Sequence, residues 1–104
     1  MSRLDMIGTH KTVVYVDSDG ATCVKYHKTD VAKRDIHGKI TLESGGWRTN
    51  TTKARMNQAL RQWASDPTQF YYVHQVKGEW LVGRYLGDGK HVRVCEYFDG
   101  VTLQ

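Results

Sequence analysis

Apolar and polar positions alternate in short runs through the first part of the chain, a period of two that is typical of half-buried β-strands. Thr12–Val16 is β-branched and aromatic, and the alternation resumes over Thr22–Tyr26 after a turn rich in Asp and Gly. Residues 30–36 predict a weaker third strand. A two-residue turn at His37-Gly38 then leads into a fourth strand around Ile40–Leu42.

A helical period replaces this alternation over residues 51–65, which predict the helix of the chain. Its apolar residues have the i, i+3, i+4, i+7 spacing of one buried face: Met56, Ala59, Leu60 and Trp63. Three residues are competent N-caps, namely Asn50, Thr51 and Thr52. Asp66-Pro67 ends the helix, because the residue before a proline avoids helical ψ. The outer face is basic or amide and carries no acid: Lys53, Arg55, Asn57, Gln58, Arg61 and Gln62.

Strands return after the helix. Residues 70–76 and 79–85 flank Lys77-Gly78 as a hairpin, residues 91–98 form a further strand, and Val101–Leu103 is a candidate short final strand. The order ββββ-α-βββ excludes a doubly wound parallel sheet. It predicts an α+β fold, a curved antiparallel sheet or open barrel packed on a single helix. No linker, repeat or low-complexity tract interrupts residues 1–104, so we expect one domain.

The hairpin after the helix has two apolar faces. Pairing through its two-residue turn places one set of side chains on one face: Phe70, Tyr72, His74, Leu81 and Tyr85. The other face holds a second set: Tyr71, Val73, Gln75, Trp80, Val82 and Arg84. One face is expected to meet the helix. The other must be covered by the N-terminal strands, by a second subunit or by a ligand.

Composition and charge narrow the class of protein. The 104 residues are 39% hydrophobic and carry 15 Lys and Arg against 11 Asp and Glu, a formal net charge of +4. This length suits one core, and the basic balance excludes an acidic mimic of nucleic acid. The charge is concentrated in residues 31–61, where seven basic and two acidic residues give a net +5: Lys33, Arg34, Lys39, Arg48, Lys53, Arg55 and Arg61 against Asp35 and Glu43.

The first ten residues and the cysteines indicate the cellular compartment. The first ten residues show no signal-peptide pattern, and no apolar run reaches membrane-spanning length, so we expect a soluble cytoplasmic protein. In such a chain Cys23 and Cys95 are better interpreted as free buried thiols than as a disulfide.

The strongest candidate for binding chemistry is the loop and helix start from Ser44 to Lys53. Two glycines let the backbone approach a partner, hydroxyls can donate hydrogen bonds, and basic side chains add charge at a helix N-terminus that favours an anion. The predicted nucleic-acid or anion-binding residues are Ser44, Gly45, Gly46, Trp47, Arg48, Thr49, Thr51, Thr52, Lys53, Arg55 and Arg61. The structural alternative is a glycine turn followed by redundant caps. The missing Gly-Lys-Ser/Thr ending excludes a P-loop.

Other constellations point to no reaction. Cys23 and His27 mirror His91 and Cys95 at the same spacing, but residues four apart on a strand are about 13 Å apart, too far to share a zinc ion. The histidines and carboxylates form no catalytic signature, so we predict a protein that is not an enzyme and that has no metal or cofactor.

Two aromatic features leave alternatives open. One group of residues is either a stacking platform for single strands or part of the core: Tyr71, Trp80, Arg84 and Arg93. Trp47 is either a packed plug or an exposed contact.

Several blocks carry a resemblance to a known family. The most specific is Ser-Gly-Gly-Trp-x-Thr-x-Thr-Thr-Lys-x-Arg-Met-Asn-Gln, which starts at Ser44, and the resemblance spans residues 20–104. The chain resembles a family of short proteins from tailed-phage genomes. The family has no assigned catalytic residues, so the resemblance implies only a viral origin and expression in the cytoplasm of the bacterial host. The strand at Thr12–Val16 is interpreted as an N-terminal extension private to this chain.

Two functions remain. The first is a non-enzymatic phage accessory protein that binds nucleic-acid phosphate through the basic glycine loop and helix N-terminus. The alternative is a protein-binding inhibitor of host or defence machinery, which would dock an acidic partner on the same surface or on the second apolar sheet face. A homodimer through that face also stays open.

Overall fold

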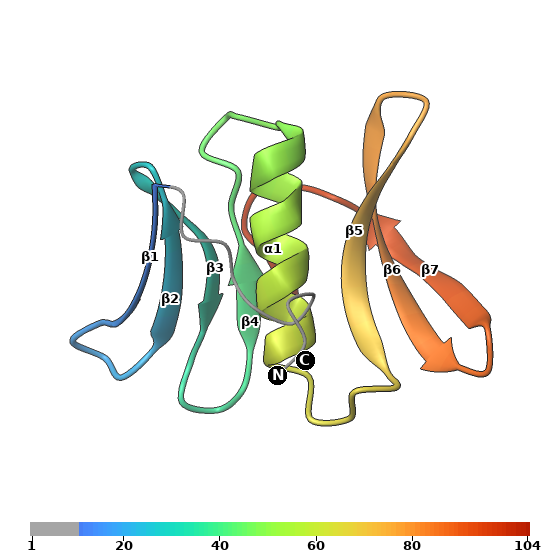
Figure 1. Cartoon of the computed structure of the whole chain (residues 1–104), viewed down its shortest axis with the longest axis horizontal. Helices are drawn as coiled ribbons and strands as arrows, with labels where there is room; N and C mark the ends of the chain where they lie inside the picture. Colours follow the sequence, from blue (N-terminus) through green and yellow to red (C-terminus); the bar gives the residue numbers. More distant parts are fainter. Residues whose placement is uncertain (1–10) are drawn as a thin grey trace.

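The computed structural model describes residues 11–104, which form two antiparallel sheets and one helix (Figure 1). The five-stranded sheet has the order β1-β2-β3-β4-β8, and the three-stranded sheet has the order β5-β6-β7. The strand bounds are β1 (Thr12–Val16), β2 (Thr22–Tyr26), β3 (Thr29–Arg34), β4 (Ile40–Leu42), β5 (Phe70–Val76), β6 (Glu79–Gly87), β7 (Lys90–Glu96) and β8 (Val101–Leu103).

The helix α1 (Asn50–Gln62) joins the two sheets, because it packs against β5 of one sheet and against β2 and β3 of the other (Figure 1). The predicted α+β class, antiparallel strands packed on one helix, is therefore confirmed. The strands divide between two open sheets. The candidate final strand exists as β8, which pairs with β4 and so returns the end of the chain to the first sheet.

Local hydrogen bonds set the element boundaries. Strand β3 ends at Arg34, earlier than predicted, because the Asp35 carboxylate accepts the N–H groups of His37 and Lys39, each at 2.9 Å, and turns the chain. The helix ends before the predicted residue 65, at a cap on Trp63 whose N–H donates to the Ala59 carbonyl.

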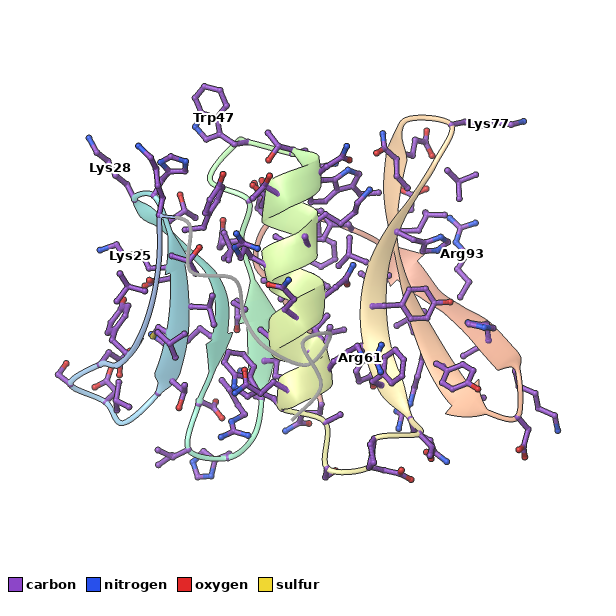
Figure 2. The ribbon with its side chains drawn as sticks, viewed as in Figure 1. Lys25, Lys28, Trp47, Arg61, Lys77 and Arg93 are labelled. Atoms are coloured by element: carbon purple, nitrogen blue, oxygen red, sulfur yellow. The ribbon has the colours of Figure 1, made fainter. Side chains whose placement is uncertain are left out.

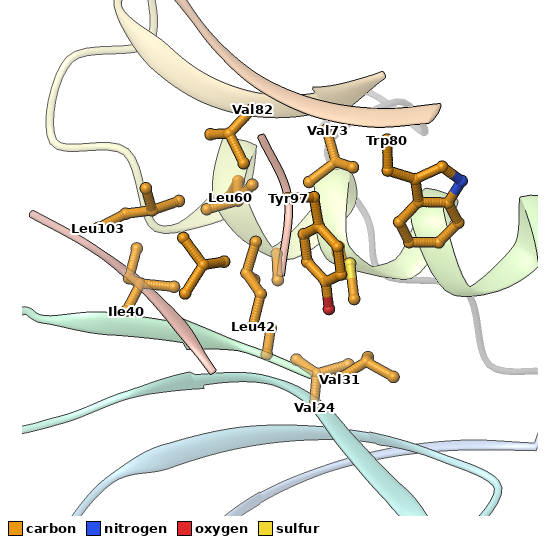
Figure 3. Close-up of a cluster of buried hydrophobic side chains, with 14 residues drawn as sticks. Val24, Val31, Ile40, Leu42, Leu60, Val73, Trp80, Val82, Tyr97 and Leu103 are labelled. Atoms are coloured by element: carbon orange, nitrogen blue, oxygen red, sulfur yellow. The ribbon is translucent and has the colours of Figure 1, made fainter. Parts of the chain in front are cut away.

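The core lies between the two sheets and is closed by the buried face of α1 (Figure 3). Met56, Ala59 and Leu60 are buried as the helical spacing predicted, whereas Trp63, the fourth residue of that predicted face, is only partly buried and packs against the core. Val73 and Val82 of the hairpin are also buried, so the face that they share with Trp80 is the one that meets the helix. Trp80 is only 3% exposed and packs edge-on against Tyr97, with 5.3 Å between ring centroids.

One side chain from the predicted outer face of the helix turns out to join helix and sheet. The Asn57 amide donates to the Val73 carbonyl at 2.8 Å, and its oxygen accepts the Val73 N–H at 2.7 Å. Strand β5 is an edge of the three-stranded sheet, so Asn57 satisfies main-chain groups that a neighbouring strand would otherwise pair. The expectation that Asn57 lies with the solvent-facing residues was wrong.

Candidate functional site

The glycine loop that precedes α1 is anchored from the far end of the chain. Asp99 accepts the Ser44 N–H at 3.0 Å, the Ser44 hydroxyl at 2.7 Å and the Tyr97 hydroxyl at 2.8 Å, all at Oδ1. Burial acts to raise the pKa of Asp99, but these hydrogen bonds and the charge of Arg48 outweigh it and lower that pKa. Ser44 is thus a buried anchor of the loop.

The two glycines of the loop differ in their surroundings. Gly45 has φ +65° and Gly46 has φ +84°, a region that side chains other than glycine rarely adopt. A Cβ at Gly45 would overlap the Thr29 side chain on β3, whereas a Cβ at Gly46 would meet nothing within 4 Å. Gly45 therefore allows close packing of the loop on the first sheet.

The threonines at the start of α1 are hydrogen-bonded to one another. Thr49 is the N-cap, and its Oγ1 accepts the Thr52 N–H at 3.2 Å. The two hydroxyls lie 3.0 Å apart, and Thr52 is buried. Thr51 lies half-buried in the first turn. The N-cap is therefore Thr49, the residue immediately before the three predicted candidates Asn50, Thr51 and Thr52.

Three predicted cations lie on aromatic rings around the N-terminal half of α1. The Arg48 guanidinium is 5.0 Å from the Tyr97 centroid and 5.9 Å from that of Trp80, and the Lys53 ammonium is also 5.9 Å from Trp80. On the opposite side of the helix, the Arg55 guanidinium is 5.8 Å from the Tyr26 ring. Within residues 11–104, no carboxylate oxygen lies within 4 Å of any of these three cations.

Arg61 is not part of this group. Its guanidinium lies 4.8 Å from the Phe70 ring, near the other end of the helix. Eight residues separate it from Lys53, a rise of about 12 Å. Figure 2 shows Arg61 toward the lower end of α1, well away from Trp47. The structure thus brings Arg48 and Lys53 together and sets Arg55 and Arg61 on other parts of the surface.

The loop and the β2–β3 turn enclose a pocket of about 410 Å³. Four predicted residues from the loop and helix line the pocket: Ser44, Trp47, Thr49 and Thr52. The other lining residues were not predicted and come from β2, β3 and their turn: Tyr26, His27, Lys28, Thr29 and Val31. Trp47 is 72% exposed, so it is an exposed residue and not a packed plug. No local sequence signal links the tight β2–β3 turn to a loop that starts sixteen residues later, so the pocket residues of that turn were not predicted.

A second surface of interest is the outer face of the three-stranded sheet, where aromatic rings cluster. Tyr72 lies across Gly83, at which a Cβ would come within 2.7 Å of the ring. The Tyr72 hydroxyl lies 2.9 Å from His91 Nδ1, and Tyr85 contacts both Phe70 (5.4 Å between centroids) and His91 (4.9 Å). These rings occupy the hairpin face opposite the core, as the pairing predicted.

The aromatic group that could have formed a stacking platform is instead divided. Trp80 is in the core and Tyr71 is packed against it, with the Arg84 guanidinium 4.9 Å from the Tyr71 ring. Arg93 pairs with Gly83 on the opposite face and lies 3.7 Å from Glu96. Core packing is the correct account of Trp80.

The cysteines are free and lie in different sheets, Cys23 in β2 and Cys95 in β7. Cys23 is fully buried and Cys95 partly so, and burial raises the pKa of the Cys23 thiol. Across residues 11–104, no three His, Cys, Asp or Glu side chains gather in a way that would hold a metal ion.

A comparison with protein families shows the family to which this chain is related. The model of the Kyanoviridae Gp96 protein family matches residues 2–104. The chain belongs to this phage family. Comparisons with curated proteins and with solved structures gave no match.

The extent of the match corrects one expectation. The Gp96 family match begins at residue 2, so it includes β1 (Thr12–Val16). This strand is therefore part of the length that the family shares and not an extension private to this chain. None of the helical structure in residues 11–104 is long and apolar enough to span a membrane.

Proposed function

We propose that this protein is a non-enzymatic nucleic-acid-binding protein whose cations around the N-terminal half of α1 contact the phosphate backbone. One observation carries the proposal: Arg48, Lys53 and Arg55 lie on aromatic rings and not on carboxylates. Lys53 donates one hydrogen bond to Gln75 at 3.4 Å, and Arg55 donates to Thr12 and to Gln58. Further N–H groups of these cations are left for a ligand while the ring contacts hold the side chains in position. No carboxylate of the described residues forms an ion pair with these three cations, although the charge of Arg48 acts on Asp99.

The helix itself supports an anionic partner. No acidic residue lies in the first turn of α1, and Lys53 lies there instead, where its charge opposes the helix dipole. A phosphate near this end would offset both charges. In this arrangement Ser44, Thr49 and Thr52 shape the loop through their internal hydrogen bonds, and the basic side chains make the contacts.

Salt dependence of oligonucleotide binding tests the proposal. Fluorescence anisotropy with a labelled oligonucleotide across a salt series should give a linear log–log plot, with a slope of about 0.7–0.9 per phosphate contact. The double variant R48Q/K53Q should lower the affinity and reduce the slope by about two contacts.

The matched control removes the same charge elsewhere. Lys39 in the β3–β4 turn and Lys90 at the start of β7 are exposed and distant from the loop, so K39Q/K90Q should leave both affinity and slope nearly unchanged. Equal losses in the two double variants would show attraction by net charge alone and would contradict this interface.

The outer face of the three-stranded sheet favours the second candidate function, a protein-binding inhibitor of host or defence machinery. Tyr72 and Tyr85 lie on it together with His91 of the edge strand β7. Tyrosines with exposed edge strands are typical of protein-binding surfaces. A partner captured from nuclease-treated host lysate by the wild type, and lost by Y85S, would support it. Capture that nuclease treatment abolishes would contradict it.

A further inference from the structure

We infer that the pocket between the glycine loop and the β2–β3 turn receives one unpaired base of a single-stranded nucleic acid. The inference rests on the proposed function and makes it more specific, because it distinguishes a single strand from a duplex. It is carried by the shape of the pocket, by the position of Trp47 and by the charge around the opening.

The size and lining of the pocket suit a flat aromatic group. Its volume of about 410 Å³ falls at the lower end of the range for small-ligand sites. The lining is mostly apolar, with Val31 and Tyr26 among its residues, and Thr29 and Thr49 add polar groups to it. A nucleobase has the same character, with apolar faces and a polar edge, whereas a phosphate would be poorly matched to such walls.

Trp47 supplies a stacking surface at the opening. Its N–H donates to the Ser44 carbonyl at 3.1 Å, so the main chain is held while the side chain projects outward. Figure 2 shows the Trp47 side chain beyond the end of α1, on the side where Lys28 extends from the β2–β3 turn. Trp47 is 72% exposed, and base stacking on exposed aromatic rings is a recurring mode of single-strand binding.

The charge around the opening complements the backbone that would flank such a base. Lys28 lines the pocket, Arg55 lies on the Tyr26 ring that forms one wall, and Arg48 follows Trp47 directly in the loop. The nearby carboxylate of Asp30 is engaged by the Tyr15 hydroxyl, 2.7 Å from both oxygens, and Asp99 is engaged by Ser44. Of the three cations, Lys28 lines the pocket itself, and Arg55 and Arg48 lie next to residues of its wall.

A duplex does not fit this arrangement. Paired bases hide their faces inside the stack, so only a base that has left the stack can enter a pocket and contact Trp47. The cations would still attract the phosphates of a duplex. The two forms of nucleic acid would therefore differ in the residues that they need for binding. Single strands would use Trp47 together with the cations, and duplexes would use the cations alone.

The test compares a single-stranded oligonucleotide with the duplex of the same sequence by fluorescence anisotropy. The wild type should bind the single strand more tightly, and W47A should weaken that binding about tenfold while leaving duplex binding unchanged. W47F, which keeps an aromatic face, should retain most of the affinity. Ile36, 71% exposed in another turn, provides the matched control, and I36A should have no effect on either ligand.

The outcomes separate this inference from the function on which it rests. If single strand and duplex bind equally, are unaffected by W47A and are both lost in R48Q/K53Q, the phosphate interface stands and the base pocket is overturned. If W47A weakens both ligands equally, Trp47 serves a general contact and the pocket is again overturned. Absence of binding to either ligand at low salt removes both proposals.

Discussion

Asp99 holds Ser44 across 55 positions of the chain through two hydrogen bonds, one to the Ser44 N–H at 3.0 Å and one to its hydroxyl at 2.7 Å. Asp99 lies two residues after the buried Tyr97 and precedes β8, the strand that returns to the first sheet. The geometry of the glycine loop, and with it the opening of the pocket, therefore depends on the C-terminal segment being in place.

Removing this anchor should destabilise the fold. D99A leaves the buried Ser44 hydroxyl without its acceptor, and we expect a loss of about 1 kcal/mol in the free energy of unfolding, since the carboxyl group is partly exposed. Urea denaturation measures this loss. E79A, which removes an exposed carboxylate at the start of β6, is the control and should change the midpoint little. Equal effects would mean that the anchor contributes nothing specific.

The same carboxyl group should make stability depend on acid pH. Burial opposes ionisation of Asp99, but the hydrogen bonds from Ser44 and Tyr97 prevail and hold its pKa below the ordinary value of 3.8. A lowered folded-state pKa means that the stabilisation is present above the unfolded pKa and is lost as the pH falls through the folded one. The urea midpoint of the wild type should fall more steeply than that of D99N below about pH 4. Parallel curves would contradict this role.

Gly45 and Gly46 offer a matched pair of substitutions. Both have positive φ, so alanine at either site should cost about 1–2 kcal/mol of backbone strain. Only Gly45 faces another residue, because its Cβ would overlap Thr29. G45A should therefore lower the free energy of unfolding by more than G46A, as measured by urea denaturation, and should also weaken oligonucleotide binding. If the two variants match, the loop does not pack on β3 as described.

Local patterns were enough to predict the elements of this fold. The alternation over Thr22–Tyr26 and the helical spacing from Met56 to Leu60 each depend on neighbours in sequence, and the structure confirms both. The division into two sheets depends instead on the pairing of the three-residue strand Val101–Leu103 with β4. Such a pairing between distant segments leaves no local period, so the sequence predicted strands without predicting how they are shared between sheets.

The candidate site shows the same limit at the level of single residues. Basic and hydroxyl side chains near a glycine pair were visible in the sequence, but their partners were not. Ser44 looked like a donor for a ligand, yet it donates to Asp99, and Trp80 looked available for stacking, yet it supports Arg48 from within the core. The far wall of the pocket at Lys28 belongs to another hairpin altogether.

Asn57 should be the most sensitive polar residue of the helix. Its side chain bonds both main-chain groups of Val73 on the edge strand β5, so N57A leaves a partly buried N–H and carbonyl unpaired. We expect a loss of about 2 kcal/mol in the free energy of unfolding. N57D keeps the acceptor but replaces the donor, and it should lose part of that amount. Q62A, on an exposed helical position, should change stability by less than about 0.5 kcal/mol. Hydrogen exchange should also show faster exchange of the Val73 amide in N57A than in Q62A. An unchanged Val73 amide would mean that β5 is held to α1 by apolar packing alone.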